Sequence, residues 1–173
     1  MKNKIILLLF TLVFIMTNAN LFSQKIAIID INGVLSNMPE YIAAQSELDQ
    51  VSATWRQEIA IEFDKVKSMY NKFQAEQVLL SNEEKVKKEE EIVKKEADVR
   101  EMQKRKFGPE GELFSKRQEM VAPIQDKVFS AIESYAAEKG LDLIFDKSGS
   151  TGLLFSNPEF DKTGDIKKRL GIK

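Results

Sequence analysis

Three acidic residues beside strand-like segments are the side chains best suited to catalysis. Asp30 ends the segment Lys25 to Asp30, and Asp142 and Asp146 belong to the segment Leu141 to Asp146. Two carboxylates brought together could act as a general acid and a general base. The chain has no His and no Cys, however, so it lacks the commonest general base, the thiol nucleophile and most transition-metal ligands. Acids beside strands are more often turn or cap residues, and we therefore expect no enzyme, no metal site and no cofactor.

The glycine-containing segment Lys147 to Gly152 could be mistaken for a phosphate-binding loop. Its residue order differs from that of a P-loop, and no helical pattern follows it directly. We interpret it as a hairpin turn leading into a third strand, Leu153 to Phe155. The segment before it alternates as a half-buried strand does, with Leu143 and Phe145 on the buried face. Three short strands make a sheet too small to stand alone, which implies oligomerisation through the sheet edges.

The N-terminus has the pattern of a secretory signal peptide. Lys2 and Lys4 form a basic region, Ile5 to Met16 is apolar apart from Thr11, and small or polar residues follow. The apolar run is too short for a membrane-spanning helix, which argues against the alternative of an uncleaved anchor. We expect a signal peptide at residues 1–23 and export across the inner membrane to the periplasm.

A very long helical region follows the first strand-like segment. No Gly or Pro occurs from Glu40 to Phe107, so this region predicts one very long helix or two. A stripe of apolar residues at helical spacing runs through the first half of this region and ends at Leu80. Ser81 with Glu84 then forms the capping box of a new helix. The first arm is thus expected from Pro39 to Leu80, about 60 Å at 1.5 Å per residue. Its apolar or permissive stripe, in steps of three and four, is Ala44, Leu48, Val51, Trp55, Ile59, Phe63, Val66, Tyr70, Phe73, Gln77 and Leu80.

A rival position for the turn is the segment Gly108 to Gly111. It would leave two helices of very unequal length, which could not both return to the same base, so we place the tip at Ser81. The segment Gly108 to Gly111 is then expected to kink or interrupt the returning helix. Beyond it the apolar stripe resumes as far as Ala136, with Pro123 as a kink or a new helix start and Gly140 as the C-cap. A short terminal helix is expected from Asp161 to Leu170.

Charge dominates the returning helix between Glu83 and Lys106. Each i,i+4 pair in the favourable order contributes a few tenths of a kcal/mol, so this stretch can stay helical with little packing. A solvated face is the simpler interpretation of such a run than a ligand-binding one. The pairs are Glu83/Lys87, Glu84/Lys88, Glu90/Lys94, Glu91/Lys95, Glu96/Arg100 and Glu101/Arg105.

The composition favours one elongated, ordered domain. The net charge of −1 becomes about −3 without Lys2 and Lys4, which gives no support for nucleic-acid binding. We expect a mainly α fold with a small β body, from which a long antiparallel helical hairpin projects as a coiled-coil arm. The body would comprise residues 24–39 and 140–173, and the arm residues 40–139.

The order of these features resembles the Skp/OmpH family of periplasmic chaperones. The resemblance covers essentially the whole chain after the signal peptide and implies a homotrimer with three strands per subunit in its body. It also implies that three hairpins enclose a cavity for unfolded outer-membrane proteins, and that no nucleotide is used. The segments that carry it are Lys25-Ile-Ala-Ile-Ile-Asp30, Val34-Leu35, Met38-Pro39-Glu40-Tyr41, the charged hairpin, Pro123-Ile124, Ala131-Ile132 and Gly140-Leu-Asp-Leu-Ile-Phe-Asp146. The residues expected in the trimer body are Ile26, Ile28, Leu143, Phe145 and Leu154.

Flexible and aromatic side chains along the arm are the candidates for contact with such clients. They are Met69, Phe73, Leu79, Leu80, Met102, Phe107, Phe114 and Met120. Most of them could equally pack the hairpin. We favour Leu79, Met102 and Phe107, because the main stripe does not need them.

Two other classes of function remain open at this stage. A passive coiled-coil spacer or a subunit of an envelope complex would also use a long hairpin, but it would be expected to show a longer uninterrupted heptad pattern. An enzyme with an inserted coiled coil would need a catalytic cluster, which the sequence lacks. The expected partners are therefore unfolded outer-membrane proteins and further copies of this chain, near a membrane surface and without nucleic acid.

Overall fold

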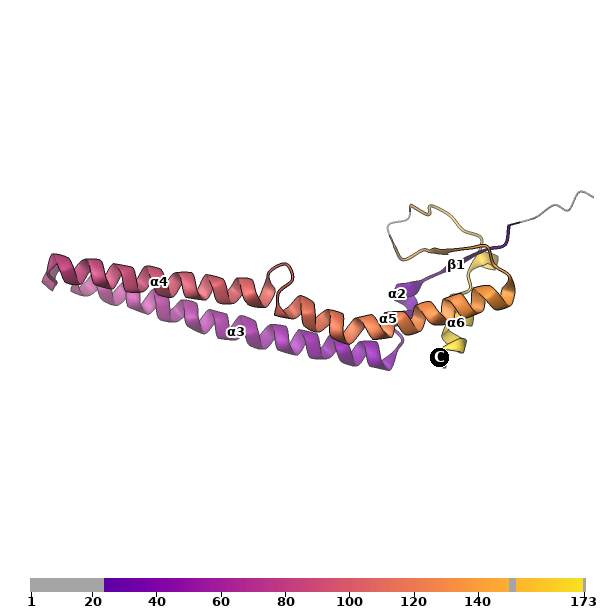
Figure 1. Ribbon diagram of the computed structural model, residues 1–173, viewed down its shortest axis with the longest axis horizontal. Helices are drawn as coiled ribbons and strands as arrows, with labels where there is room; N and C mark the ends of the chain where they lie inside the picture. Colours follow the sequence, from indigo (N-terminus) through magenta and orange to yellow (C-terminus); the bar gives the residue numbers. More distant parts are fainter. Residues whose placement is uncertain (1–23, 150–151, 173) are drawn as a thin grey trace, which may run out of the picture.

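A long helical hairpin attached to a small body makes up the computed structural model, which describes residues 24–149 and 152–172 (Figure 1). The signal peptide expected at residues 1–23 lies outside the described residues. Along the chain come β1 (Ile26–Ile29), α2 (Ile31–Leu35), α3 (Pro39–Glu76), α4 (Asn82–Phe107), α5 (Glu112–Lys139), β2 (Leu143–Asp146) and α6 (Thr163–Arg169). The mainly α hairpin with a small β body, expected from the sequence, is confirmed.

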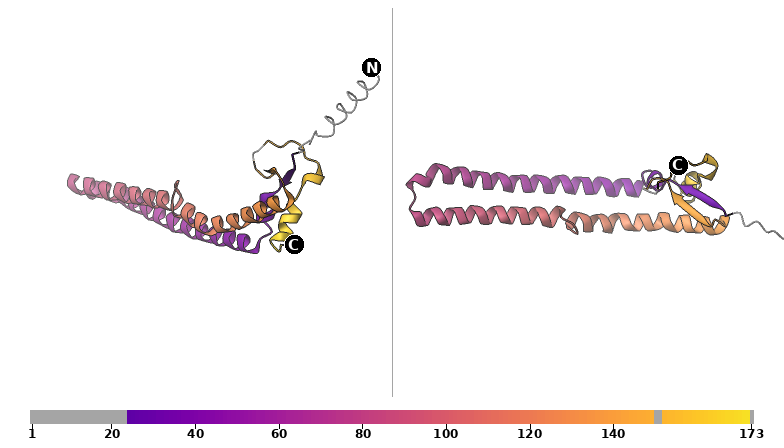
Figure 2. Two further views of the ribbon diagram at one scale, coloured as in Figure 1. Left: turned by 45° about the vertical axis from the view of Figure 1, so that its right-hand side comes forward. Right: turned by 90° about the horizontal axis from the view of Figure 1, so that it is seen from above.

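The two limbs of the arm meet at the capping box expected at Ser81. The Ser81 hydroxyl accepts a hydrogen bond from the Glu84 N–H, and the Glu84 carboxylate accepts one from the Ser81 N–H at 2.9 Å. A short 3₁₀ turn, Gln77–Leu79, links α3 to this cap. The limbs then run side by side as far as the start of α3, and the last turns of α5 continue beyond it into the body (Figure 2, right).

The returning limb is broken, not merely kinked, between Phe107 and Glu112. The chain loops out there and α5 resumes the course of α4 (Figure 1). A Cβ at Gly108 would lie 2.4 Å from the Lys104 carbonyl oxygen, and one at Gly111 would lie 2.8 Å from that of Arg105. Glycine is therefore the residue that fits this tight loop. No new helix begins at Pro123, which lies inside α5.

The β body contains a parallel pair of strands within the described residues. In the register of β1 and β2, Ile28 lies opposite Phe145 and Ala27 opposite Ile144. The third strand expected at Leu153 to Phe155 is not formed, and that prediction is wrong for the single chain. The other edge of β1 is already occupied, because Ile28 bridges to Asp161.

The core of the molecule lies between the sheet and the ends of the helices. It combines side chains from β1, α2, α5 and α6, namely Ile29, Val34, Leu35, Met38, Val128, Tyr135 and Ile166. The last turns of α5 therefore belong to the body as well as to the arm. The expected burial of β2 is reversed: Ile144 packs against this core, while Leu143 and Phe145 are 46% and 39% exposed. Ile144 therefore lies on the sheet face that packs against the helices, and Leu143 and Phe145 lie on the other face.

Candidate functional site

Each of the three acids considered for catalysis accepts a hydrogen bond from a backbone N–H group. Asp142 accepts a hydrogen bond from the Lys25 N–H at 2.7 Å, at the opposite end of β1 from Asp30. Asp30 caps α2 through the Gly33 N–H at 2.6 Å. Burial alone would raise the pKa of Asp146, but hydrogen bonds from Ser148 and Ile31 lower it. Among residues 24–149 and 152–172, no group of three or more acidic side chains could hold a metal ion.

The seam between α3 and the returning limb is mainly apolar along α3 and mixed along α4. Along α3 it uses residues four and three apart, among them Leu48, Ser52, Ile59 and Phe73, which are all buried. Along α4 only Val99 is buried, while Ile92 and Met102 are half-buried. Four lysines are half-buried on the same limb: Lys85, Lys88, Lys95 and Lys106. The tip half of the arm is therefore held by few apolar contacts.

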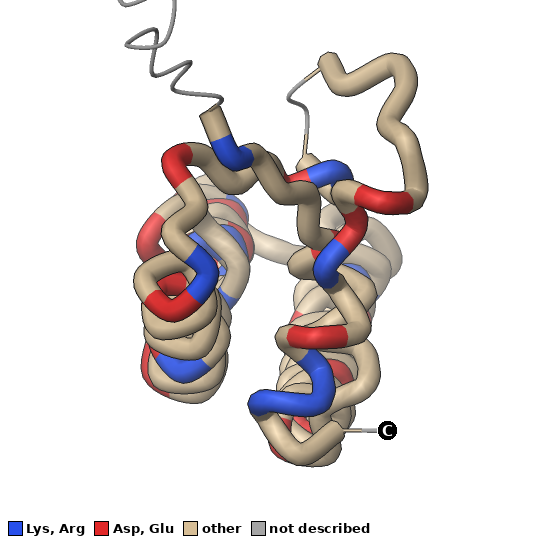
Figure 3. Tube along the Cα trace, turned by 90° about the vertical axis from the view of Figure 1, so that its right-hand side faces the viewer, with Lys and Arg blue, Asp and Glu red and all other residues tan. Residues whose placement is uncertain are grey.

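Ion pairs between the limbs set the register of the hairpin. Lys95 lies 2.6 Å from Glu62, and hydrogen bonds from Lys65 and Lys95 lower the pKa of Glu62 to about 2. Nearer the body, Lys116 pairs with Glu47 and Lys127 with Glu40. Acidic and basic residues are interspersed in the body, which faces the viewer in Figure 3, and they also alternate in the sequence of α4.

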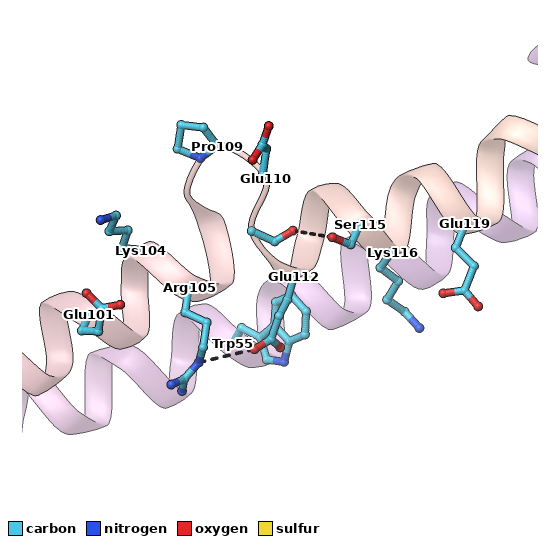
Figure 4. Close-up of a pocket in the computed structure, with 11 residues that line it drawn as sticks. Trp55, Glu101, Lys104, Arg105, Pro109, Glu110, Glu112, Ser115, Lys116 and Glu119 are labelled. Carbon is cyan, nitrogen blue, oxygen red and sulfur yellow. Dashed lines mark hydrogen bonds and ion pairs between the residues drawn. The ribbon is translucent and has the colours of Figure 1, made fainter.

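An aromatic junction lies beside the break in the returning limb. Trp55 meets Phe107 edge to face, with ring centroids 6.2 Å apart, and the Lys106 Nζ lies 4.2 Å from the centre of the Trp55 ring. Lys106 and Arg105 both pair with Glu112 across the break. An open pocket of about 600 Å³ lies here, lined mostly by charged side chains (Figure 4). The junction joins the two halves of the arm.

The sequence of this chain matches a known protein family, and its fold matches a solved structure. The model of the family described as outer membrane protein (OmpH-like) matches residues 25–170. This chain belongs to the OmpH-like family. A solved structure of a candidate OmpH-like outer membrane chaperone from Caulobacter crescentus CB15 shares the fold, with a TM-score of 0.65 and 13% identity over 86% of this chain and 84% of that one. No curated protein matches the sequence.

The arm of this OmpH-like chain exposes some of the expected contact residues and buries others. Leu79 is 85% exposed and Phe114 is 48% exposed, whereas Phe73 is buried in the seam. Phe107 packs against Trp55, so the prediction that packing does not need Phe107 is wrong. The remaining candidates are half-buried: Met69, Leu80, Met102 and Met120.

Two aromatic residues assigned to the apolar stripe of this OmpH-like arm lie outside it. Phe63 and Tyr70 are 36% and 52% exposed, because the seam passes through Glu62 and Met69, one position earlier. On the returning limb the exposed Val86 and Val93 lie seven residues apart, a pair that the sequence interpretation missed. A strict alternation of four and three residues from Leu48 is one of the registers that the α3 sequence allows, and it places Glu62 and Met69 in the seam.

The body of the OmpH-like chain exposes apolar side chains on the sheet face away from the core. Of the residues expected in a trimer body, Leu143, Phe145 and Leu154 are exposed, Ile26 is half-buried and Ile28 is buried. Phe155 is also 84% exposed. Within the parts of the chain that the structure describes, no helix is both long and apolar enough to span a membrane.

Proposed function

We propose that this chain is an ATP-independent holdase chaperone of the periplasm. In this proposal its arms bind unfolded outer-membrane proteins in the cavity of a homotrimer and prevent their aggregation. The observation that carries the proposal is the OmpH-like match over residues 25–170 on a chain whose long arm leaves apolar side chains in solvent. The proposal includes no catalytic step and no cofactor.

The arm suits a partner that has no fixed shape. A holdase needs many weak apolar contacts that can adapt to different sequences. Val78 and Leu79 at the tip are more than four-fifths exposed, and Phe114 lies half exposed beyond the break. The half-buried lysines of α4 leave the seam with few apolar contacts, so the limbs can shift at little cost in free energy.

The body suits association with further copies of the chain. A two-stranded parallel sheet is too small to be stable alone, and an unpaired strand edge invites pairing. Leu143, Phe145, Leu154 and Phe155 lie exposed around this sheet, and exposed apolar groups of this kind mark interaction sites. Three copies joined here would project three arms and leave a cavity between them.

The decisive experiment is an aggregation assay with an urea-unfolded outer-membrane β-barrel and no nucleotide. A holdase should suppress light scattering at about one trimer per client, and light scattering of the mature protein alone should give about three times the monomer mass. A passive spacer would leave aggregation unchanged at any ratio. A monodisperse monomer would contradict the proposed cavity.

A further inference from the structure

The arm is a ribbon of two helices with two broad faces (Figure 2, right). One step along an α-helix turns by about 100°, so residues before and after a seam position lie on opposite flanks. A pocket of about 190 Å³ is lined by Lys72, which precedes the seam residue Phe73, and by Glu91, which precedes Ile92. The preceding residues of both limbs therefore share one face. The residues that follow seam positions share the other face.

The two faces differ in composition. The face of the preceding residues is charged: a second pocket on it is lined by Asp98, Glu101 and Arg105. The opposite face carries Phe63 and Tyr70 from α3, and Val86 and Val93 from α4, which are between 36% and 64% exposed. We call these four residues the apolar face. The charged Lys67 and Glu89 lie between them on the same face. On the charged face of this half of the arm, Ile61 is the large apolar side chain left exposed among the described residues.

The ion pair between Glu62 and Lys95 places these residues in two rungs. Because the limbs are antiparallel, the pair puts Phe63 within about one residue of the level of Val93, and Tyr70 within about one residue of the level of Val86. The rungs are about 10 Å apart, since seven residues rise about 1.5 Å each. The result is a short apolar ladder that spans both limbs.

The apolar face looks toward the side of the molecule on which the sheet rises. Figure 4 shows Arg105, which marks the charged face, on the side of the arm opposite to Pro109 and Glu110. The loop that carries Pro109 and Glu110 rises on the same side as β1 and the segment after β2 (Figure 1). That segment carries the exposed Leu154 and Phe155. The apolar face of the arm is thus on the side of the molecule on which this segment of the body lies.

We infer that the apolar face is the surface along which the arm holds an extended, unfolded polypeptide. The inference rests on the proposed function and adds the residues and the face that contact the client. Four partly covered side chains offer on the order of 400 Å², about half of what each partner contributes to a stable protein interface. A second folded arm would bind such a patch weakly. A flexible chain with alternating apolar residues can contact both rungs and continue along the arm.

The test compares two sets of substitutions in the full mature chain. The first set removes the apolar face: Phe63→Gln, Tyr70→Gln, Val86→Gln and Val93→Gln. The control removes the exposed apolar side chain of the charged face: Ile61→Gln, at a residue that is 48% exposed. Gln is a good helix former, so circular dichroism and trimer mass should stay unchanged. The first set should weaken binding of an unfolded outer-membrane β-barrel about fivefold, and the control less than about twofold.

Equal losses in the two sets, or no loss in the first, would overturn the inference. Loss of trimer mass in the first set without loss of client binding would also overturn it, because the face would then join copies of this chain. A photo-crosslinker at Val93 or at Asp98 gives a second readout that needs no folding argument. The client should crosslink at Val93 and not at Asp98. Absence of holdase activity in the unmodified protein would instead refute the proposed function.

Discussion

In the body, side chains from β1, α2, α5 and α6 share one core, and Ile29, Val34 and Ile166 are completely buried. In the tip half of the arm, by contrast, α4 buries Val99 alone among its described residues, and lysines occupy neighbouring seam positions. The body is stabilised by apolar burial, which is cooperative and intolerant of change. The tip half depends more on helix capping and charge pairs, which are individually weak.

This difference separates two tasks within one chain. Burial in the body holds the base of the arm in one arrangement. Weak contacts between α3 and α4 leave the outer half able to adjust and leave apolar side chains in solvent. A surface for unfolded chains gains from this second property, because such partners differ in sequence and shape.

The largest expected effect is loss of packing in the body. Ile166→Ala removes a completely buried side chain and should lower the free energy of unfolding by about 2–5 kcal/mol. Ile59→Ala in the arm seam should cost less, about 1–2 kcal/mol, because its loosely packed surroundings can close the cavity. Urea titration at one protein concentration measures both. Equal costs would show that the arm is packed as tightly as the body.

A smaller loss in the free energy of unfolding is expected for a substitution at Gly108, in the loop between α4 and α5. In Gly108→Ala the new Cβ would meet the Lys104 carbonyl at 2.4 Å, so the end of α4 must shift, at a cost of about 1–3 kcal/mol. Gly164→Ala in α6 is the control, because nothing lies within 4 Å of its Cβ and alanine favours helix. An unchanged midpoint of thermal unfolding for Gly108→Ala would mean that the loop rearranges freely.

An apolar residue in place of a seam lysine should make the tip half of the arm depend on apolar burial, as the body does. Lys88 lines a pocket with Met69, Phe73 and Ile92, so Lys88→Leu should stabilise α4 by about 1 kcal/mol. Hydrogen exchange of the α4 amides should slow about fivefold, and the exposed control Lys87→Leu should leave it unchanged. Faster exchange in Lys88→Leu would show that the lysine, and not apolar contact, holds this half together.

The smallest effect concerns pH and an ion pair of the body. Burial alone would raise the pKa of Asp161, but hydrogen bonds from Lys147 and Thr163 outweigh it and lower the pKa from 3.8 to about 2. A depressed pKa stabilises the fold above pH 4, and this stability is lost as the pH falls from about 4 to about 2. With the Asp161 side chain 30% exposed, the loss should be about 1 kcal/mol. Asp161→Asn should flatten this part of the curve, measured by urea titration at each pH; an unchanged slope would contradict the pair's role.

Much of the arm followed from local signals in the sequence. The absence of Gly and Pro from Glu40 to Phe107 predicted the helices, and Ser81 with Glu84 predicted the turn between them. Gly140 was expected to cap α5 and does so with a φ of 61°. These features depend on hydrogen bonds within a few residues, and the side chains that make them are adjacent in the sequence.

The identity of the candidate contact residues was less accessible from the pattern. Phe63 and Tyr70 fitted an apolar stripe, yet the seam passes one residue earlier, through Glu62 and Met69. Apolar residues three or four positions apart can belong to more than one stripe on the same helix. Only the partner helix decides which of these stripes is covered. Phe107 was likewise expected to be free because the main stripe did not need it. Its packing partner, Trp55, lies 52 positions earlier in the chain, so no local pattern links the two residues.

The sequence by itself determined the main limits of the long helices, namely the start at Pro39, the turn at Ser81 and the C-cap at Gly140, because caps, turns and periodicity act over one or two helical turns. Tertiary structure alone decided which face of β2 is buried, that Leu153 to Phe155 forms no strand, and which residues of the arm stay in solvent. Those outcomes depend on β1 pairing with β2 and with Asp161 across more than a hundred residues. Such pairing is selected by the packing of the whole body, and a local pattern carries no information about it.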